Sequence, residues 1–356
     1  MKKLVCLILS MILLLGTFTA CGGNTATTPE TTAAPTTEPT IPSQSPEEEE
    51  VFKILMIGQS HAQDASWLVC DVLSAEMPDK KFLVADIYQP LHLDQHIKNI
   101  KENNAVYDYA EITNGSNLVK YSGYTINVAV KKHQWDLIVF NEATWPQTEE
   151  ASYTDGDFQW LTDWLRENAA WPYFKFAYNA TWAQPVSAEN YAPGRQTAPD
   201  SFRDTYNDKF GGDRTKHFAR ICEMMEKYVE TDPDYDYVFH SGTAIQYASE
   251  TFGVPEGDPN RRYELYRDYT HMSDFGRLIV AYQWYCQIFG IEELKEVNVN
   301  VIPSHMRTKC AIFYGDLAID DTMKQAIIES VNYALKNPNI APPQTARETP
   351  VLEPLN

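Results

Sequence analysis

Strands that alternate with helices along most of this chain predict an α/β fold. Short apolar runs such as residues 52–57 (FKILMI) and 137–140 (LIVF) are typical of strands buried on both faces of a parallel sheet. Segments with helical spacing follow most of these runs. Because parallel strands need crossover connections, the pattern predicts a three-layer α/β/α sandwich with a parallel sheet of about five strands.

The expected elements lie between residues 51 and 337, which is enough chain for one large α/β domain. The expected strands are at residues 52–57, 82–88, 137–140, 174–178 and 235–240. The expected helices are at residues 62–77, 93–103, 125–132, 213–231, 243–252, 274–289 and 320–336. Residues 105–124 alternate around Asn114 and Gly115, which predicts a hairpin excursion.

The N-terminus has the pattern of a secretory signal peptide over residues 1–20. Lys2 and Lys3 precede an apolar run at residues 4–15 that is too short to span a bilayer as a mature helix. Small residues then stand directly before Cys21, an order that resembles the bacterial lipobox. We therefore expect a lipoprotein signal and lipidation of Cys21. The alternative is an ordinary signal peptide with an incidental cysteine.

Residues 21–50 are rich in Thr, Pro, Ser and Glu and have almost no large apolar side chains. Such a segment cannot bury enough surface to offset the entropy of ordering, so it predicts a disordered spacer. The tail at residues 338–356 is Pro-rich and is expected to be loose. Together with Cys21, this organisation predicts a domain held at the extracytoplasmic face of the cell membrane by its N-terminal lipid only.

The net charge of the chain is −20. An excess of negative charge repels phosphate backbones, so we expect no nucleic-acid partner. Neutral carbohydrates, or esters of them, fit this charge better. Aromatic residues make up 12% of the chain, which suits a sugar-stacking cleft and an ordinary core equally well.

Nothing in the sequence calls for a metal or another cofactor. The four cysteines of the domain lack CxxC spacing, which argues against a zinc ribbon and leaves open one disulfide or buried free thiols: Cys70, Cys222, Cys286 and Cys310. His92 and His96 have a helical metal-ligand spacing, with Asp94 between them. No other segment offers a clear third ligand, so we favour an ordinary surface or supporting position for both histidines.

The segment Gly58-Gln59-Ser60 follows the first expected strand. In a parallel sheet, ligands bind beyond the carboxyl ends of the strands. A serine at the start of the next helix would lie where free N–H groups and the helix dipole favour negative charge. This setting suits a serine nucleophile. The alternative is structural, since Ser60 and Gln63 have the spacing of a capping box.

Asp268 and His271 form an Asp-x-x-His pair before one of the last helices. A carboxylate three residues before a histidine can reach its Nδ1 and leave Nε2 to take a proton from a serine. Either pattern alone is common. A Gly-x-Ser after the first strand together with Asp-x-x-His near the last helices is much more specific, and it predicts a Ser60-His271-Asp268 triad.

This pairing resembles the SGNH (GDSL-like) hydrolases, and the chain most closely resembles a bacterial branch classed as domain of unknown function 4886. The resemblance is carried in order by ILMIGQS (54–60) with QDA (63–65), WDLIV (135–139), TWA (181–183), GTAIQ (242–246) and DYTHMSDFGR (268–277). It implies the flavodoxin-like SGNH hydrolase fold, with Ser60, Asp268 and His271 as catalytic residues.

In SGNH enzymes, the nucleophile N–H, a second-block glycine N–H and a third-block Asn side chain hold the oxyanion. The resemblance therefore implies Ser60 and Asn141 as donors, although Asn141 is also a routine turn residue. The second-block region here, residues 88–92, has no glycine, and Pro90 has no N–H. The N–H groups of Gln89 and Leu91 are the candidate substitutes.

The candidate lining of the substrate cleft consists of polar and aromatic residues near the ends of strands: Gln59, His61, Gln89, Glu142 and Trp182. We expect a cell-surface serine esterase that removes acyl groups, acetyl above all, from carbohydrate or another small ester without a cofactor. The alternative is a catalytically weak glycan-binding lipoprotein that retains the SGNH fold. The altered second block motivates that alternative.

Overall fold

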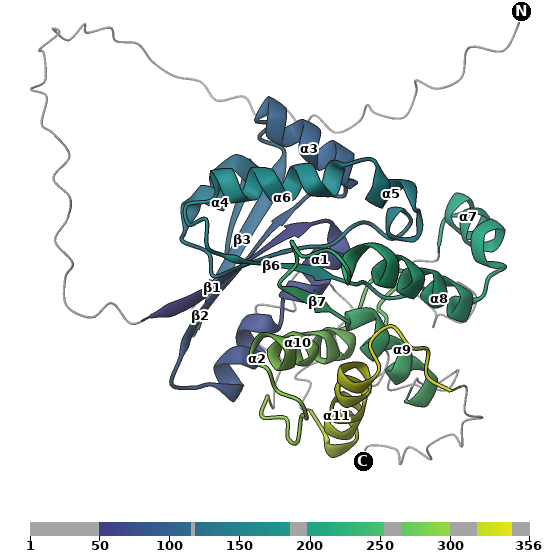
Figure 1. Ribbon diagram of the computed structural model, residues 1–356. Helices are drawn as coiled ribbons and strands as arrows, with labels where there is room; N and C mark the ends of the chain where they lie inside the picture. The colour runs from purple at the N-terminus through teal and green to yellow at the C-terminus, as the bar shows by residue number, and fades with distance from the viewer. Residues whose placement is uncertain (1–49, 115–117, 186–197, 253–264, 300–318, 344–356) are drawn as a thin grey trace, which may run out of the picture. The chain divides into compact units, whose positions relative to one another are not determined.

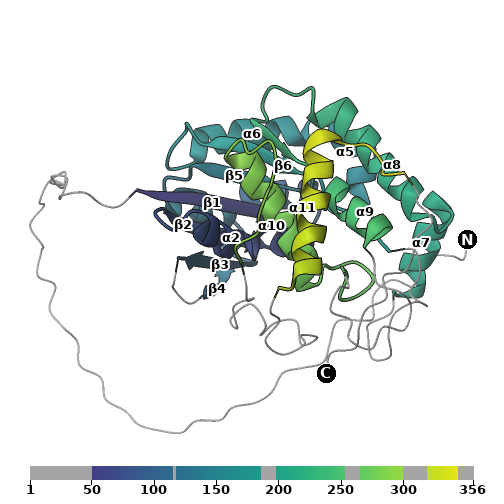
Figure 2. The ribbon, with the colours of Figure 1, turned by 90° about the horizontal axis from the view of Figure 1, so that it is seen from below.

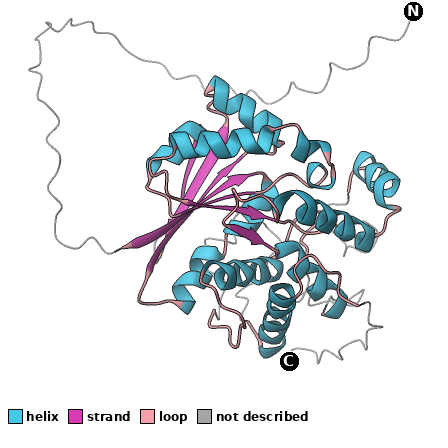
Figure 3. Cartoon of the chain, in the orientation of Figure 1, coloured by secondary structure: helices cyan, strands magenta, loops and turns pink. Residues whose placement is uncertain are grey.

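The computed structural model describes residues 50–114, 118–185, 198–252, 265–299 and 319–343. Helices cover both faces of a central sheet, so the predicted three-layer α/β class is confirmed (Figure 3). The strands of this domain are β1 (Val51–Gly58), β2 (Lys81–Tyr88), β3 (Tyr107–Thr113), β4 (Val119–Tyr124), β5 (Leu137–Phe140), β6 (Lys175–Asn179) and β7 (Tyr237–Phe239).

The first helices are α1 (Ser60–Ser66), α2 (Val69–Glu76), α3 (Leu93–Glu102), α4 (Ile126–Lys132), α5 (Ala151–Thr154) and α6 (Asp157–Asn168). The later helices are α7 (Asp200–Phe210), α8 (Arg214–Met224), α9 (Ser241–Thr251), α10 (Asp274–Ile288) and α11 (Asp321–Lys336). A 3-10 turn covers Pro146–Thr148, and a π-helical turn at Met225–Val229 extends α8.

The described strands form one mixed sheet in the order β4-β3-β2-β1-β5-β6-β7. Five neighbouring strands of this sheet are mutually parallel, as predicted, namely β2, β1, β5, β6 and β7. The expected total of about five strands is nevertheless too low, because the hairpin β3–β4 adds two antiparallel strands. Strand β3 pairs with β2 from Leu83↔Thr113 to Tyr88↔Asp108 and so satisfies backbone groups that the edge of β2 would otherwise expose.

Helices lie on both faces of the sheet (Figures 1 and 2). An apolar layer packs between the sheet and the helices on each face. Helices α1, α2, α9, α10 and α11 pack on the face that receives Ile54 and Met56 of β1. Helices α3, α4, α6 and α8 pack on the face that receives Leu55 and Ile57. All four of these β1 residues are 0% exposed, which explains why this strand is a continuous apolar run rather than an alternating one.

The helices differ from the sequence-based expectation in four places. The expected helix over residues 62–77 is divided into α1 and α2 by a turn at Trp67 and Leu68. Helices α5, α6 and α7 were not expected. Helix α6 does carry a helical signal, since its buried residues include Phe158, Leu161 and Leu165 at spacings of three and four.

The carboxyl ends of the parallel strands meet at one edge of the sheet. Ile57 of β1 is in register with Phe140 of β5, and Phe140 is in register with Tyr178 of β6. Helix α1 begins two residues after β1 ends, and α1 also packs against α10. The segments after these strands therefore gather where parallel sheets commonly bind ligands.

The expected signal peptide, Cys21 and almost all of the expected spacer lie outside the described residues, as does Cys310. Of the other cysteines, Cys70, Cys222 and Cys286 are buried free thiols, which answers the open question for these three residues. None of the helices in the described ranges combines the length and the apolar character needed to cross a membrane.

The close approach of α9 to the segment after β6 requires a glycine at position 242. A Cβ atom on Gly242 would lie 2.3 Å from the carbonyl oxygen of Thr181, which belongs to the backbone and cannot rotate away. We predict that Gly242→Ala lowers the free energy of unfolding by about 2 kcal/mol or more, the range of core overpacking. Urea denaturation would measure this loss. Thr251→Ala in the last turn of α9 is the control, and an equal loss in both variants would contradict the steric argument.

Candidate active site

Ser60 is the first residue of α1, and Gln59 caps the helix. The Gln59 Oε1 atom accepts the His61 N–H at 2.8 Å. The capping-box alternative for Ser60 is therefore wrong, and Gln63 instead donates from Nε2 to Asp86 at 3.0 Å. The Ser60 hydroxyl is half-buried and donates to Gln59 Oε1 at a long 3.3 Å. The serine side chain thus has no capping role.

Asp268 and His271 form the hydrogen-bonded pair that their spacing predicts. His271 Nδ1 lies 2.8 Å from Asp268 Oδ2 and 3.0 Å from Oδ1. Asp268 also accepts the backbone N–H groups of Thr270 at 2.9 Å and His271 at 2.8 Å. Because a carboxylate is an acceptor, His271 Nδ1 is the donor in this pair, and a neutral ring with this tautomer has its lone pair on Nε2.

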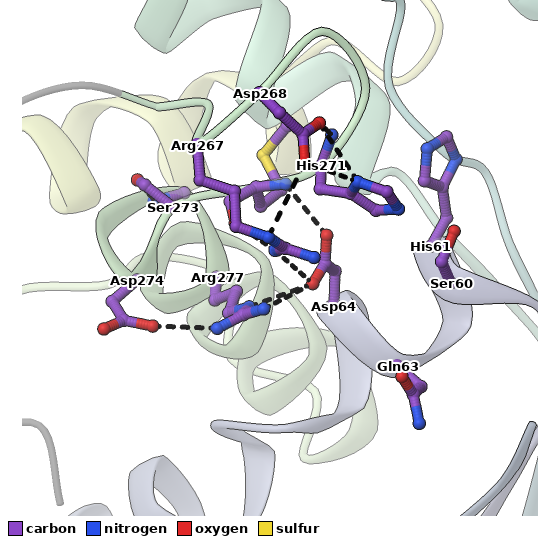
Figure 4. Close-up of polar contacts among 12 residues, drawn as sticks. Ser60, His61, Gln63, Asp64, Arg267, Asp268, His271, Ser273, Asp274 and Arg277 are labelled. Atoms are coloured by element: carbon purple, nitrogen blue, oxygen red, sulfur yellow. Dashed lines mark hydrogen bonds and ion pairs between the residues drawn. The ribbon is translucent and has the colours of Figure 1, made fainter. Parts of the chain in front are cut away.

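The loop that carries His271 lies beside the start of α1 (Figure 4). The rings of His61 and His271 are 6.0 Å apart at an interplanar angle of 84°. No hydrogen bond joins Ser60 to His271 among the described residues. Serine–histidine contacts of this kind are often loose until substrate binds. The structure therefore brings the predicted nucleophile and base into one neighbourhood, without direct contact.

His61 belongs to a buried polar network behind Ser60. Its Nε2 lies 2.9 Å from Thr270 Oγ1 and its Nδ1 lies 3.3 Å from Thr144 Oγ1. Gln184 Nε2 donates to both hydroxyls, at 2.5 Å to Thr270 and 3.0 Å to Thr144. Burial and then the neighbouring His271 lower the pKa of His61 from 6.5 to about 3. His61 is therefore neutral at physiological pH and 1% exposed, so it supports the site from below rather than lining a cleft.

Trp182 has a similar supporting position. Its side chain is 0% exposed, and its Nε1 donates to the carbonyl of Thr270 at 3.0 Å. Its ring lies 4.8 Å from that of His61. Trp182 therefore packs beneath the His271 loop instead of forming part of a cleft wall, because the segment after β6 is covered by that loop.

The two oxyanion donors that the resemblance implies are the Ser60 N–H and the Asn141 side chain. The Ser60 N–H makes no hydrogen bond among the described residues, so it is available. Asn141 lies against Gly58, where a Cβ atom would be 3.2 Å from Asn141 Oδ1. Asn141 Nδ2 donates one hydrogen to the Glu142 carbonyl at 3.1 Å, which leaves its second N–H for an oxyanion.

The two candidate substitutes for the missing second-block glycine are not available. Gln89 N–H donates to the carbonyl of Gly58 at 3.1 Å, and Leu91 N–H donates to the carbonyl of Gln89 at 2.8 Å. The side chain of Gln89 donates to the carbonyl of Val106. Gln89 is therefore bound to its own surroundings by both its backbone and its side chain.

Glu142 adjoins Ser60 through Gln59, whose Nε2 donates to the Glu142 carbonyl at 3.3 Å. Its carboxyl group accepts the N–H groups of Ala143 at 2.6 Å and Leu93 at 3.2 Å. Burial raises the pKa of Glu142 to about 7, against the opposing effect of these N–H groups. Glu142 also lines an open cavity of about 410 Å³ whose other acidic residues are Asp94, Glu149, Asp155 and Asp157.

His92 and His96 do not contact a common partner. His96 is buried, and its Nδ1 lies 2.9 Å from the Tyr107 hydroxyl. His92 precedes the helix and lines the acidic cavity. Among the described residues, no three His, Cys, Asp or Glu side chains are placed to hold a metal ion.

Asp64, Arg267 and Arg277 were not predicted from the sequence to have a role at the site. Asp64 is a buried carboxylate on α1 that contacts both arginines and so joins α1 to the His271 loop (Figure 4). The only signal for this contact was a lone Asp on the apolar face of a helix, between Ala62 and Ala65.

The buried, neutral state of His61 predicts a measurable dependence of stability on pH. The unfolded chain binds a proton at His61 near its ordinary value of 6.5, whereas the folded chain does so near 3. Stability from this group is therefore complete above 6.5 and is lost as the pH falls. We predict that wild type loses about 2 kcal/mol more than His61→Gln between pH 7 and pH 5.

Urea denaturation of both proteins at the two pH values measures this difference. The comparison of variants matters because Asp71 and Glu142, whose pKa values are raised to about 7 by burial, titrate in the same range with the opposite sign. Identical pH dependence in wild type and His61→Gln would contradict the neutral buried imidazole.

The comparisons with known proteins agree with the family that the motifs indicate. No curated protein matches the sequence. The structure is similar to the crystal structure of a DUF4886 family protein from Bacteroides uniformis, with a TM-score of 0.62 and 20% identity over 82% of this chain and 98% of that chain. A candidate SGNH hydrolase from Slackia heliotrinireducens is more distant, with a TM-score of 0.40 and 15% identity over 67% and 100% of the two chains. The family model for DUF4886, a domain of unknown function, matches residues 53–314. This chain therefore belongs to the DUF4886 family.

Proposed function

We propose that this protein is a serine hydrolase of the SGNH type that cleaves esters. One observation carries the proposal: the Asp268 carboxylate holds His271 Nδ1 at 2.8 Å on a loop beside the helix that begins with Ser60. In this arrangement Ser60 is the nucleophile, His271 is the base, and Asp268 orients His271.

The reaction has two steps. His271 Nε2 takes the Ser60 proton as Oγ attacks the ester carbonyl, and the Ser60 N–H and Asn141 Nδ2 stabilise the oxyanion. The tetrahedral intermediate collapses to an acyl-serine, and His271 returns the proton to the departing alcohol. Water, deprotonated by His271, then attacks the acyl-serine and releases the acid and the free Ser60 hydroxyl.

Asp268 is suited to stabilise the imidazolium that forms in both steps. Burial alone would raise the pKa of Asp268, but the hydrogen bonds and charge of His271 and the backbone N–H groups lower it. The carboxylate therefore stays ionised at neutral pH. A negative charge beside Nδ1 favours the protonated ring without taking its proton.

We infer that the substrate is an acylated neutral carbohydrate. The cavity beside Glu142 carries five carboxyl side chains, whose oxygens can accept hydrogen bonds from sugar hydroxyls. The same side chains repel anionic groups. The signal peptide and the lipidation of Cys21 expected from the sequence support this proposal, because a lipid-anchored enzyme at the cell surface would meet polysaccharides there.

Two observations favour a second function, a catalytically weak glycan-binding protein with the same fold. Ser60 makes no hydrogen bond to His271 among the described residues, and the N–H groups of Gln89 and Leu91 are occupied by other carbonyls. Loss of one oxyanion donor weakens transition-state stabilisation by about 3 kcal/mol. Glycan binding without turnover, unchanged in Ser60→Ala, would select this function.

We predict that the purified domain hydrolyses an activated acetate ester and that Ser60→Ala lowers kcat by at least about 10³-fold, because the acyl-serine cannot form. Release of the chromogenic alcohol measures the rate. Ser66→Ala, on the last residue of the same helix, is the matched control and should retain activity. Equal rates for wild type and Ser60→Ala would rule out Ser60 as nucleophile.

The acidic cavity predicts discrimination by charge. An acetylated neutral sugar should be hydrolysed with a kcat/KM at least about 3-fold higher than the same ester carrying a carboxylate, because the carboxylates that line this open cavity repel a like charge. The ratio should fall at high ionic strength, since salt screens the repulsion. Competing rates in one reaction give the ratio directly. A preference for the anionic ester would count against this cavity as the sugar site.

A further inference from the structure

Asp64 is a buried carboxylate that joins α1 to a part of the chain that is distant in sequence. Its Oδ1 accepts Arg267 Nη1 at 2.7 Å and Arg277 Nη2 at 2.6 Å. Asp64 is 1% exposed and Arg277 is 0% exposed, so little water screens these pairs. Asp274 completes the cluster with a 2.9 Å contact to Arg277 Nη1. We name these residues, Asp64, Arg267, Asp274 and Arg277, the buried ion cluster.

The contacts of Asp64 bracket His271. The Met272 N–H donates to Asp64 Oδ2 at 2.8 Å, and Arg267 Nη1 donates to the Met272 carbonyl at 2.6 Å. The Arg267 N–H in turn donates to the His271 carbonyl at 2.9 Å. Met272, which directly follows His271, is thus bound to Asp64. Arg267, whose backbone binds the His271 carbonyl, is bound to Asp64 as well.

Asp64 lies one helical turn after Ser60 on the same helix. A helix is stiff over one turn, so a group fixed to Asp64 keeps a constant position relative to Ser60. Burial alone would raise the pKa of Asp64, but the charges of Arg267 and Arg277 hold it well below its usual range. The Asp64 carboxylate is therefore ionised near neutral pH and keeps both arginine partners there.

We propose that Asp64 is a positioning residue, which sets the separation of the Ser60 hydroxyl and the His271 imidazole by binding the His271 loop to α1. The kinetic part of this inference rests on the proposed function. Asp64 does not touch the reacting atoms. Misplacement of a catalytic group by about 1 Å can lower a rate about 100-fold, so a displaced loop should affect kcat much more than KM.

Asp64→Asn removes the charge and keeps the size of the side chain. Asp274→Asn is the matched control, because it weakens the same ion cluster without touching α1. We expect Asp64→Asn to lower kcat for an activated acetate ester by about 100-fold, with KM within about 3-fold of wild type. Asp274→Asn should lower kcat less than about 3-fold at a comparable Tm. Equal losses of kcat in the two variants would overturn the proposal in favour of a purely structural role.

Amide hydrogen exchange tests the same proposal without any enzymatic assay. In Asp64→Asn, a peptide covering residues 265–273 should exchange at least about 10-fold faster than in wild type, while α10 keeps its protection. Asp274→Asn should leave that peptide protected. Unchanged exchange in Asp64→Asn overturns the positioning role even if the protein is an esterase.

One further result separates the proposed function from the positioning role of Asp64, and a second variant provides a substitute for Asp64→Asn. If wild type hydrolyses no ester but Asp64→Asn loosens the loop, the proposed function fails and the positioning contact stands. Arg267→Lys serves if Asp64→Asn does not fold, since lysine keeps the charge but its Nζ lies one bond closer to the backbone than the Nη1 atom that contacts both Asp64 and the Met272 carbonyl. Its peptide should also exchange faster, and a fully protected loop in Arg267→Lys would contradict the proposal.

Discussion

The candidate site depends on one buried contact, the ion pairs of Asp64 with Arg267 and Arg277. Arg267 is 203 residues from Asp64 in the sequence, yet the two side chains meet at 2.7 Å. Removing ions from water costs several kcal/mol for each, of order 5, and only close pairing and additional hydrogen bonds offset this cost. Asp64 meets that condition, because Met272 N–H and both arginines donate to it. The contact therefore tolerates little displacement of either segment.

The His271 loop is held from its other side by uncharged groups. Thr270 contacts His61 and Gln184 through its hydroxyl and Trp182 through its carbonyl. The pKa of His61 is lowered to about 3 by burial and by His271, so this side of the loop adds no positive charge near His271. An imidazolium at His271 thus faces a neutral ring on one side and the carboxylate of Asp268 on the other.

Several buried polar atoms at this edge of the sheet have no hydrogen-bond partner among the described residues. Buried atoms without a hydrogen-bond partner include Asn141 Oδ1, Thr181 Oγ1, Gln184 Oε1 and His217 Nε2. Leaving such atoms unpaired costs about 1–3 kcal/mol each, so they are uncommon in a region that serves stability alone. Such atoms also occur elsewhere in the described residues, for example Asp71 Oδ2 on α2 and Gln283 Oε1 on α10, so they do not by themselves mark this edge as a ligand site.

The sequence by itself determined those features that depend on neighbouring residues. The apolar run of β1, the helix after Gly58 and the Asp268–His271 hydrogen bond follow from strand burial, glycine and a three-residue spacing. The family and the parallel part of the sheet were also predicted correctly. Helix α6 was missed although its apolar spacing was present, because the helical signal of this short segment was weaker than the signal of the neighbouring strands.

Only the tertiary structure decided the choice of partners over long distances. It made Gln59 rather than Ser60 the helix cap, bound the N–H groups of Gln89 and Leu91 to other carbonyls, and covered Trp182 with the His271 loop. It also paired Asp64 with two arginines. The physical reason is that each of these outcomes depends on which segments meet at the edge of the sheet. Hydrophobic packing of the whole domain sets that arrangement, and no local spacing encodes it.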